Sequence, residues 1–293
     1  MTDSYLYDGQ SADDHVGSCP ECTAAITLLD QPDPAALPPP RLREAVLSRA
    51  RRRRTPAEAG VAEVAVPYAE QVALMDDLLA ELRPPQWNAP AARHRSVRAM
   101  VEHLAANDAL VAWFLGVRAR EPELVYRRWR EQAGSLLQRV SGSTGALLGA
   151  EVELAGTGPA RGSLRQAMIQ RTFETWTHAD DIRAVIDRPA QPPPPEHVRM
   201  IAEFGLTMLP RAVKGPRRDV SATFVLTGPG GGTWTVPLSS TPDRVAVVLS
   251  ADLVHFCRLL ANRWPRGAFP YAAEGDAALA RELVRTAATL GCD

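Results

Sequence analysis

The stretch Arg171-Thr-Phe-Glu-Thr-Trp-Thr-His-Ala-Asp-Asp-Ile182 lies inside a long helical pattern that decides how the rest of the chain is interpreted. The pattern begins after Ser163, a residue type favoured as a helix N-cap, and ends before Pro189. Steps of three and four residues place Glu174 and His178 one turn apart on an otherwise apolar face. Buried polar groups need partners, and one metal ion would satisfy both side chains. A surface Glu–His pair is the alternative, and this helix alone does not decide between them.

Length and composition bound the class of protein. The 293 residues suffice for two or three domains, and 45% hydrophobic with 23% charged residues is ordinary for a globular protein in water. A formal net charge of -1 argues against a polyanion-binding surface, so we expect no direct nucleic-acid contact. The chain has no apolar run of the roughly 18 to 20 residues that a membrane span needs, and its start does not resemble a signal peptide. We therefore expect a cytoplasmic protein without a membrane partner.

The first thirty residues contain a candidate metal site. Cys19 and Cys22 form a Cys-x-x-Cys pair, whose thiolates lie close enough to share one ion. His15, four residues before Cys19, reaches the same point if residues 13–18 are close to helical. A redox dithiol is the alternative, but no strand–helix thioredoxin pattern surrounds the pair. The spacing therefore favours Zn²⁺ bound by His15, Cys19 and Cys22.

A proline-rich linker, Pro32–Pro40, follows this site and is expected to be extended. Next comes a short amphipathic helix over about residues 41–50, which ends in the arginine run Arg51–Arg54. No aromatic residues are interleaved with these arginines. We therefore interpret the run as a solvated helix end rather than a nucleic-acid grip.

The combination of His-x-x-x-Cys-x-x-Cys, three prolines and Leu-Arg-Glu-x-Val-Leu resembles the zinc-binding anti-sigma factors over residues 13–54. This resemblance implies that the metal hairpin and the helix after the linker bind a sigma factor. The family usually has a further ligand upstream, whereas no His or Cys precedes His15 here. Asp13, Asp14, water or an exogenous thiol could supply the fourth ligand.

Residues 57–190 are predicted to form an up-and-down bundle of four helices, the kind of fold whose core commonly holds metals. His103 lies among apolar residues on the second helix, as Glu174 and His178 do on the fourth. A single histidine on an apolar face is more often a satisfied core residue. Three such polar residues on facing helices, however, match the donor set of a catalytic zinc site with an open fourth position. We predict a metal site of His103, Glu174 and His178, with a purely structural metal as the plainer alternative.

Two segments carry a second resemblance. Val101-Glu-His-Leu-Ala-Ala and Phe173-Glu-Thr-Trp-Thr-His-Ala-Asp-Asp-Ile-Arg resemble the two metal motifs of the DinB-like, mycothiol-dependent maleylpyruvate isomerases. The resemblance implies that His103, Glu174 and His178 are the metal ligands and that a small thiol, mycothiol, binds nearby.

The aspartates beside this motif, Asp180 and Asp181, become candidates to support the ligands or to pack the helices. The histidines His94, His197 and His255 stay unassigned, and we interpret them as surface or structural residues.

Residues 196–293 are predicted to form a small α+β domain after a second proline run. A helix over about 198–209 precedes a hairpin of 220–226 and 234–238, a strand over 244–250, and two closing helices. The tail, with Cys257-Arg-Leu-Leu-Ala-Asn-Arg and Glu274-Gly-Asp-Ala-Ala-Leu-Ala, resembles the sterol-carrier-like domain that often accompanies the isomerase bundle. The predicted fold class is thus mainly α, with a zinc-binding segment (1–56), a DinB-like bundle (57–190) and an α+β domain (196–293).

Two function classes follow. As a regulator, the N-terminal zinc segment would hold a sigma factor while the metal-binding bundle senses a ligand or thiol state. As an enzyme, the bundle metal would lower the pKa of a bound thiol, whose thiolate would add to an electrophile. The fusion of the two segments favours the regulator, and the missing upstream ligand favours the enzyme. We expect the regulator, with a mycothiol-dependent metalloenzyme as the alternative.

Overall fold

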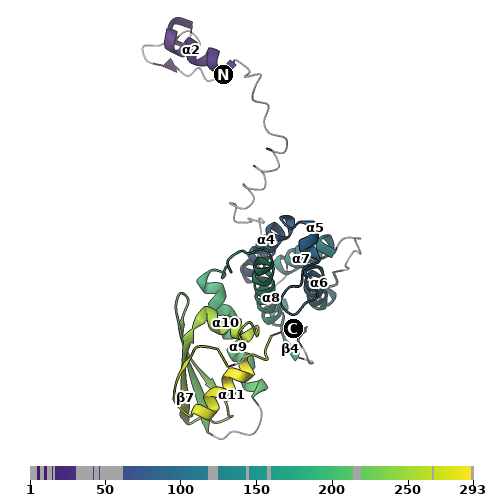
Figure 1. Cartoon of the computed structure of the whole chain (residues 1–293), viewed down its shortest axis with the longest axis vertical. Helices are drawn as coiled ribbons and strands as arrows, with labels where there is room; N and C mark the ends of the chain where they lie inside the picture. The colour runs from purple at the N-terminus through teal and green to yellow at the C-terminus, as the bar shows by residue number, and fades with distance from the viewer. Residues whose placement is uncertain are drawn as a thin grey trace. The chain divides into compact units, whose positions relative to one another are not determined.

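The protein is described from a computed structural model of the chain. The structure describes residues 5–6, 10–11, 15, 17–30, 42, 46, 62–117, 125–142, 145–156, 160–213, 219–265 and 267–291. The chain divides into two compact units, residues 1–50 and 51–293 (Figure 1). Among the described residues, no helix is both long and apolar enough to cross a membrane.

The N-terminal unit contains the helix α2 (Pro20–Asp30) and two short antiparallel strands, β1 (Tyr5–Leu6) and β2 (Gln10–Ser11). Within the helix predicted after the linker, the structure describes two residues, which are helical and exposed: Leu42 and Val46. The proline-rich linker and the arginine run lie outside the described residues.

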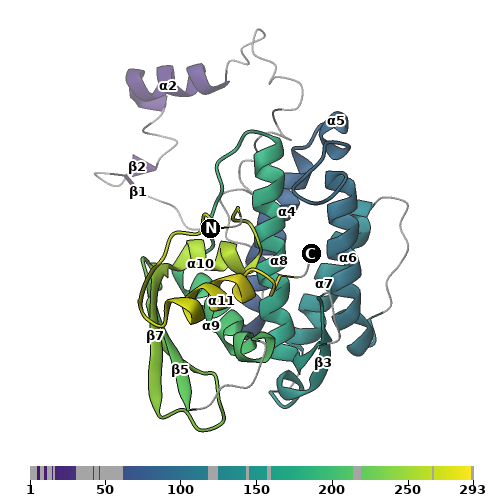
Figure 2. The same cartoon turned by 60° about the horizontal axis from the view of Figure 1, so that its bottom comes forward.

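The second unit begins with a bundle of four long helices (Figures 1 and 2). They are α4 (Val66–Ala80), α6 (Val97–Phe114), α7 (Val125–Ser141) and α8 (Leu164–Val185). The predicted N-cap is present, because Ser163 Oγ accepts from the backbone N–H of Gln166 at 3.2 Å. Ser96 caps α6 in the same way, accepting from the backbone N–H of Ala99 at 3.1 Å. The side chain of Gln166 in turn accepts from the backbone of Ser163, which completes a capping box.

The helix α8 is the central element of this unit. It packs against α4 and α6 on the bundle side and against α9 on the other side, so it is buried almost all round. A helix in that position has no solvent-facing stripe, which explains why its sequence mixes apolar residues with Thr, Glu and His rather than showing one clean apolar face. Glu174 and His178 are both buried, with 3% and 1% of their surface exposed.

Three short elements connect the long helices. The helix α5 (Pro84–Trp87) follows α4, and the hairpin of β3 (Glu151–Leu154) and β4 (Ala160–Ser163) leads directly into α8. None of these elements was predicted from the sequence. Four-residue segments are too short for a periodic pattern to identify.

The rest of the second unit, which we call the α+β part, is a four-stranded sheet with helices on one face (Figures 1 and 2). Its strands lie in the order β6–β5–β7–β8, in which β5 is antiparallel to β6 and parallel to β7. The strands are β5 (Val220–Thr227), β6 (Gly232–Pro237), β7 (Arg244–Asp252) and β8 (Ala272–Gly275). The helices are α9 (Pro195–Ala212), α10 (Leu253–Leu260) and α11 (Ala277–Ala287).

The predicted hairpin is present as β5 and β6. Its turn needs glycine because Gly228 and Gly230 have φ values of 94° and 81°, which side chains with a Cβ rarely adopt. The edge strand β8 was not predicted, since the sequence Ala-Ala-Glu-Gly has no strand-like pattern.

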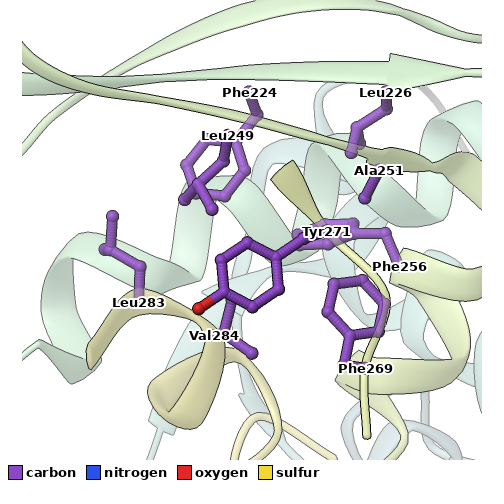
Figure 3. Close-up of a pocket in the computed structure, with 9 residues that line it drawn as sticks. All are labelled: Phe224, Leu226, Leu249, Ala251, Phe256, Phe269, Tyr271, Leu283 and Val284. Carbon is purple, nitrogen blue, oxygen red and sulfur yellow. The ribbon is translucent and has the colours of Figure 1, made fainter. Parts of the chain in front are cut away.

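The interior of the α+β part is closely packed. Figure 3 shows a small apolar cavity beneath the sheet, where the ring of Tyr271 lies near Leu283 and stacks on Phe269 with centroids 6.1 Å apart. The volume of this cavity is about 10 Å³. That is room for one water molecule at most, so the cavity is part of the core. Cys257 is buried in the same core, whereas Cys292 lies outside the described residues.

Candidate metal centres

Three histidines converge at one point in the second unit. Each of His94, His103 and His178 offers one ring nitrogen, and these nitrogens all lie within 4.8 Å of one another. The ring centroids form a nearly equilateral triangle with sides of 5.0, 5.3 and 5.3 Å. Two ligand atoms of a tetrahedral zinc ion are roughly 3.4 Å apart. To hold an ion, each pair of ring nitrogens would therefore have to come closer by no more than about 1.4 Å. The donor set therefore fits a zinc ion.

Each histidine comes from a different piece of backbone. His103 lies two turns into α6, and His178 lies in the middle of α8. His94 lies in the loop before α6, where its backbone N–H donates to Ala91 O at 2.9 Å and its carbonyl accepts from Ala91 N at 3.2 Å. Between them Ala92 has a φ of 49°, which tightens the turn and directs the chain back toward the bundle. His94 and His103 are half-buried, whereas His178 is buried.

The orientation of His178 is set by a carboxylate. Its Nδ1 lies 3.2 Å from Asp181 Oδ2, one turn further along α8. An Nδ1–H donated to this carboxylate leaves Nε2 as the nitrogen with a lone pair for a metal ion. Burial raises the pKa of Asp181, but hydrogen bonds from His178 and Arg263 outweigh it, so the pKa lies below its usual value and the carboxylate is charged.

Glu174 lies next to the histidine trio but is not part of it. Its Oε1 accepts from Arg171 Nη2 at 2.9 Å, and its Oε2 accepts from Asn107 Nδ2 at 2.7 Å. The same Asn107 nitrogen lies 2.9 Å from His103 Nε2. Both oxygens of Glu174 are therefore engaged with protein donors, and the carboxylate reaches His103 through an amide. Direct ligation by Glu174 stays a prediction.

A buried polar network continues from Glu174 across the bundle. Arg171 Nη1 lies 3.7 Å from Asp108 Oδ1, and Tyr68 Oη donates to Asp108 Oδ2 at 2.7 Å. Burial raises the pKa of Asp108 to about 7, although Arg171 and the Tyr68 hydroxyl act in the opposite direction. The network links α4, α6 and α8 directly behind the histidine trio.

The N-terminal unit holds the second group of ligand atoms. One ligand atom from each of His15, Cys19 and Cys22 lies within 4.8 Å of the others, as the spacing predicted. The turn that places them is helical, because Cys19 N donates to His15 O at 2.8 Å. Cys19 precedes α2, and a hydrogen bond from the Cys22 backbone lowers the pKa of its thiol, which favours the thiolate that binds metal. The aspartates suggested as a fourth ligand, Asp13 and Asp14, lie outside the described residues.

Sequence reasoning missed His94. It left the residue unassigned, as a surface or structural histidine, because a loop position has no helical periodicity to connect it with His103 and His178. The available signal was its place two residues before the N-cap Ser96, at the start of a helix already thought to carry a ligand.

Asp180 and Asp181 were both proposed to support the ligands or to pack the helices, and they divide these roles. Asp181 contacts His178, whereas Asp180 accepts from Arg183, Gln191 N and Arg258.

No model of a known protein family matches the chain, and no curated protein matches its sequence. Two solved structures resemble it, those of the mycothiol-dependent maleylpyruvate isomerase and of a histidine-to-alanine mutant of that enzyme. Each match covers 73% of this chain and 93% of that chain, at 15% sequence identity and a TM-score of 0.46. A likeness of this degree carries no argument about function, which has to be inferred from this chain's own residues.

Proposed function

We propose that the bundle is a zinc-dependent, thiol-binding centre in which His94, His103 and His178 hold the ion. The observation that carries this proposal is the convergence of three imidazoles from three separate backbone segments. Three nitrogen ligands are the donor set of zinc sites that keep a fourth position open for a water or a substrate. A structural zinc site instead has four protein ligands, and among the described residues the cluster provides three.

The open position suits a small thiol. When bound, a zinc ion lowers the pKa of a thiol ligand and supplies a thiolate at neutral pH. His94 and His103 are half-buried, so the centre is within reach of a ligand from solvent. The resemblance of the sequence around His103 and His178 to the metal motifs of mycothiol-dependent isomerases makes mycothiol, or a thiol like it, the expected ligand. Addition of the thiolate to an unsaturated acid or a related electrophile is the reaction class that follows.

The chain's own residues have separate roles in this centre. Asp181 holds Nδ1–H of His178, so that Nε2 faces the ion. Asn107 connects His103 with Glu174, whose charge Arg171 balances. These contacts orient the ligands without occupying the open position.

The test uses Co²⁺ in place of Zn²⁺, because its visible spectrum reports the ligands. The full-length chain carrying Cys19→Ser and Cys22→Ser retains no thiolate at its N-terminal site, so a thiolate-to-cobalt band that appears only when a thiol is added reports the bundle centre. We expect a small thiol to produce this band, and His178→Ala to abolish it. A cobalt spectrum that does not respond to thiol would refute the proposal.

A second candidate function is zinc-dependent binding of a sigma factor by the N-terminal unit. What favours it is the convergence of His15, Cys19 and Cys22 beside α2, whose side chain Ile26 is 41% exposed. Under this second function, the bundle would sense a thiol, and the N-terminal unit would transmit the response to the sigma factor.

This second function is tested by co-purification from the native cells. The full-length chain should retain a sigma factor, and the Cys19→Ser/Cys22→Ser variant should lose it, because both thiolates are needed to hold the hairpin. Recovery of no sigma factor with the zinc-loaded chain would leave only the thiol-binding function.

A further inference from the structure

We propose that the α+β part completes the bundle's metal centre: Arg263 fixes the carboxylate of Asp181, and Asp181 in turn orients His178 toward the ion. Arg263 is thus a positioning residue that acts through Asp181, and its Nη2 also lies 3.5 Å from His178 Nδ1. The inference deepens the proposed zinc centre and rests on it. It also gives the α+β part a role in retaining the metal.

The contact between Arg263 and Asp181 is bidentate. Arg263 Nε lies 2.9 Å from Asp181 Oδ1, and Arg263 Nη2 lies 2.7 Å from Oδ2. The two side chains are 14% and 10% exposed, so solvent screens this pair far less than a surface salt bridge. Two parallel hydrogen bonds fix the plane of the carboxylate as well as its position. Oδ2, the oxygen that contacts His178 Nδ1, is consequently held in place.

Arg263 is itself held by its own backbone. Its Nη1 donates to Ala261 O at 2.8 Å, and its backbone N–H donates to Arg258 O at 2.8 Å. The preceding residue, Asn262, has a φ of 53°, which turns the chain sharply after α10. One edge of the guanidinium is therefore bound to the α+β part and another to the bundle. The geometry of His178 depends on this connection, because histidine ligands need a fixed partner on the second ring nitrogen.

A neighbouring ion pair offers a matched comparison. Arg258, also from the α+β part, donates to Asp180 Oδ2 at 3.1 Å, one residue before Asp181 on α8. Asp180 also accepts from Arg183 and from the backbone of Gln191. Both arginines thus join the same two parts of the molecule through adjacent carboxylates, but the carboxylate that contacts a candidate ligand is the one paired with Arg263.

The experiment measures the affinity of the bundle centre for Zn²⁺ by competition with a chromophoric chelator, in the full-length chain carrying Cys19→Ser and Cys22→Ser. Arg263→Met is expected to weaken the affinity by about 10- to 100-fold, the range for partners of metal-bound histidines. Arg263→Lys keeps the charge but loses the bidentate contact, so we expect an intermediate loss. Arg258→Met should stay within about twofold of the parent.

A second readout separates positioning from general loosening of the interface. At saturating Co²⁺, Arg263→Met should shift the visible spectrum of the centre, whereas Arg258→Met should leave it unchanged. Equal losses in the two methionine variants, or no loss in Arg263→Met, would overturn the role of Arg263 while leaving the zinc centre intact. Zinc affinity that does not change in His178→Ala would instead refute the zinc centre itself, and this inference with it.

Discussion

At the scale of single residues, His94 and Glu174 differ in their expected role: one is a candidate direct ligand of the metal, and the other is a candidate outer partner. The imidazole of His94 belongs to the converging trio, whereas both carboxylate oxygens of Glu174 are engaged by Arg171 and Asn107. A direct ligand and an outer partner differ in how much metal affinity they contribute. Substitution of each residue therefore distinguishes a three-histidine site from the His–Glu–His site that the sequence predicted.

The expected result is a much larger effect at His94. Loss of a direct ligand in His94→Ala should weaken bundle zinc by more than about 100-fold, whereas Glu174→Gln should cost about 10- to 100-fold as an outer partner. Zinc titration of the two variants measures this, with His255→Ala as a control because His255 lies outside the histidine trio and its Nδ1 is 3.9 Å from Asp252. A larger loss in Glu174→Gln than in His94→Ala would restore Glu174 as the ligand.

Asp108 should make stability depend on pH. Its pKa is raised to about 7, from a value near 3.8 in the unfolded chain, so between these pH values the folded protein binds more protons than the unfolded protein. Its contribution to stability is therefore complete below about pH 4 and is lost as pH rises through about 7. The free energy of unfolding should fall with a slope of up to about 1.4 kcal/mol per pH unit from this group.

Urea unfolding between about pH 4.5 and 7.5 with a metal chelator present measures this slope. Asp108→Asn removes the titrating group but keeps an acceptor for Tyr68, so its stability should depend less steeply on pH than that of the parent. Identical slopes in the two proteins would show that Asp108 keeps an ordinary pKa.

At the scale of elements, α8 determines both the fold and the site. It carries His178 and Asp181 on successive turns, and it packs on helices of the bundle and of the α+β part. Its start is fixed by the capping box of Ser163 and Gln166 immediately after β4. Fraying at this end would loosen the helix that positions the candidate ligands, so the cap contributes to the site through stability.

Removing the cap should therefore be measurable. Ser163→Ala is expected to lower the free energy of unfolding by about 1 kcal/mol, because the backbone N–H of Gln166 loses its acceptor. Ser135→Ala on α7, where the hydroxyl only donates back to Glu131 O, should change it by less than about 0.5 kcal/mol. Urea unfolding of both variants provides the comparison, and equal effects would argue against the cap.

At the scale of the whole molecule, the two candidate centres lie in different compact units. We therefore expect them to bind metal independently. The parent chain should contain about two zinc ions, and either Cys19→Ser/Cys22→Ser or His178→Ala should reduce this to about one. Elemental analysis of the purified proteins gives these numbers. If the cysteine variant kept both ions, the N-terminal centre would be wrong, and if it lost both, the centres would be coupled.

The sequence by itself predicted the four-helix bundle, the N-cap Ser163 and the convergence of His15, Cys19 and Cys22. These depend on interactions between residues close in the chain: the hydroxyl of Ser163 and the N–H of Gln166, or His15 and Cys19 across one helical turn. Periodicity and spacing report such contacts directly. The hairpin of β5 and β6 was predictable for the same reason, since its glycine-rich turn is local.

Only the tertiary structure showed which candidate ligands lie together and which side chains support them. His94 and His178 are 84 residues apart, and Asp181 and Arg263 are 82 apart, so no local pattern connects them. For Glu174 the local pattern was present but incomplete. Its spacing to His178 suits a shared metal, yet Arg171 and Asn107 contact its two carboxylate oxygens. Which buried partner satisfies a polar side chain depends on all the elements packed around it, and that choice is made when the bundle and the α+β part assemble.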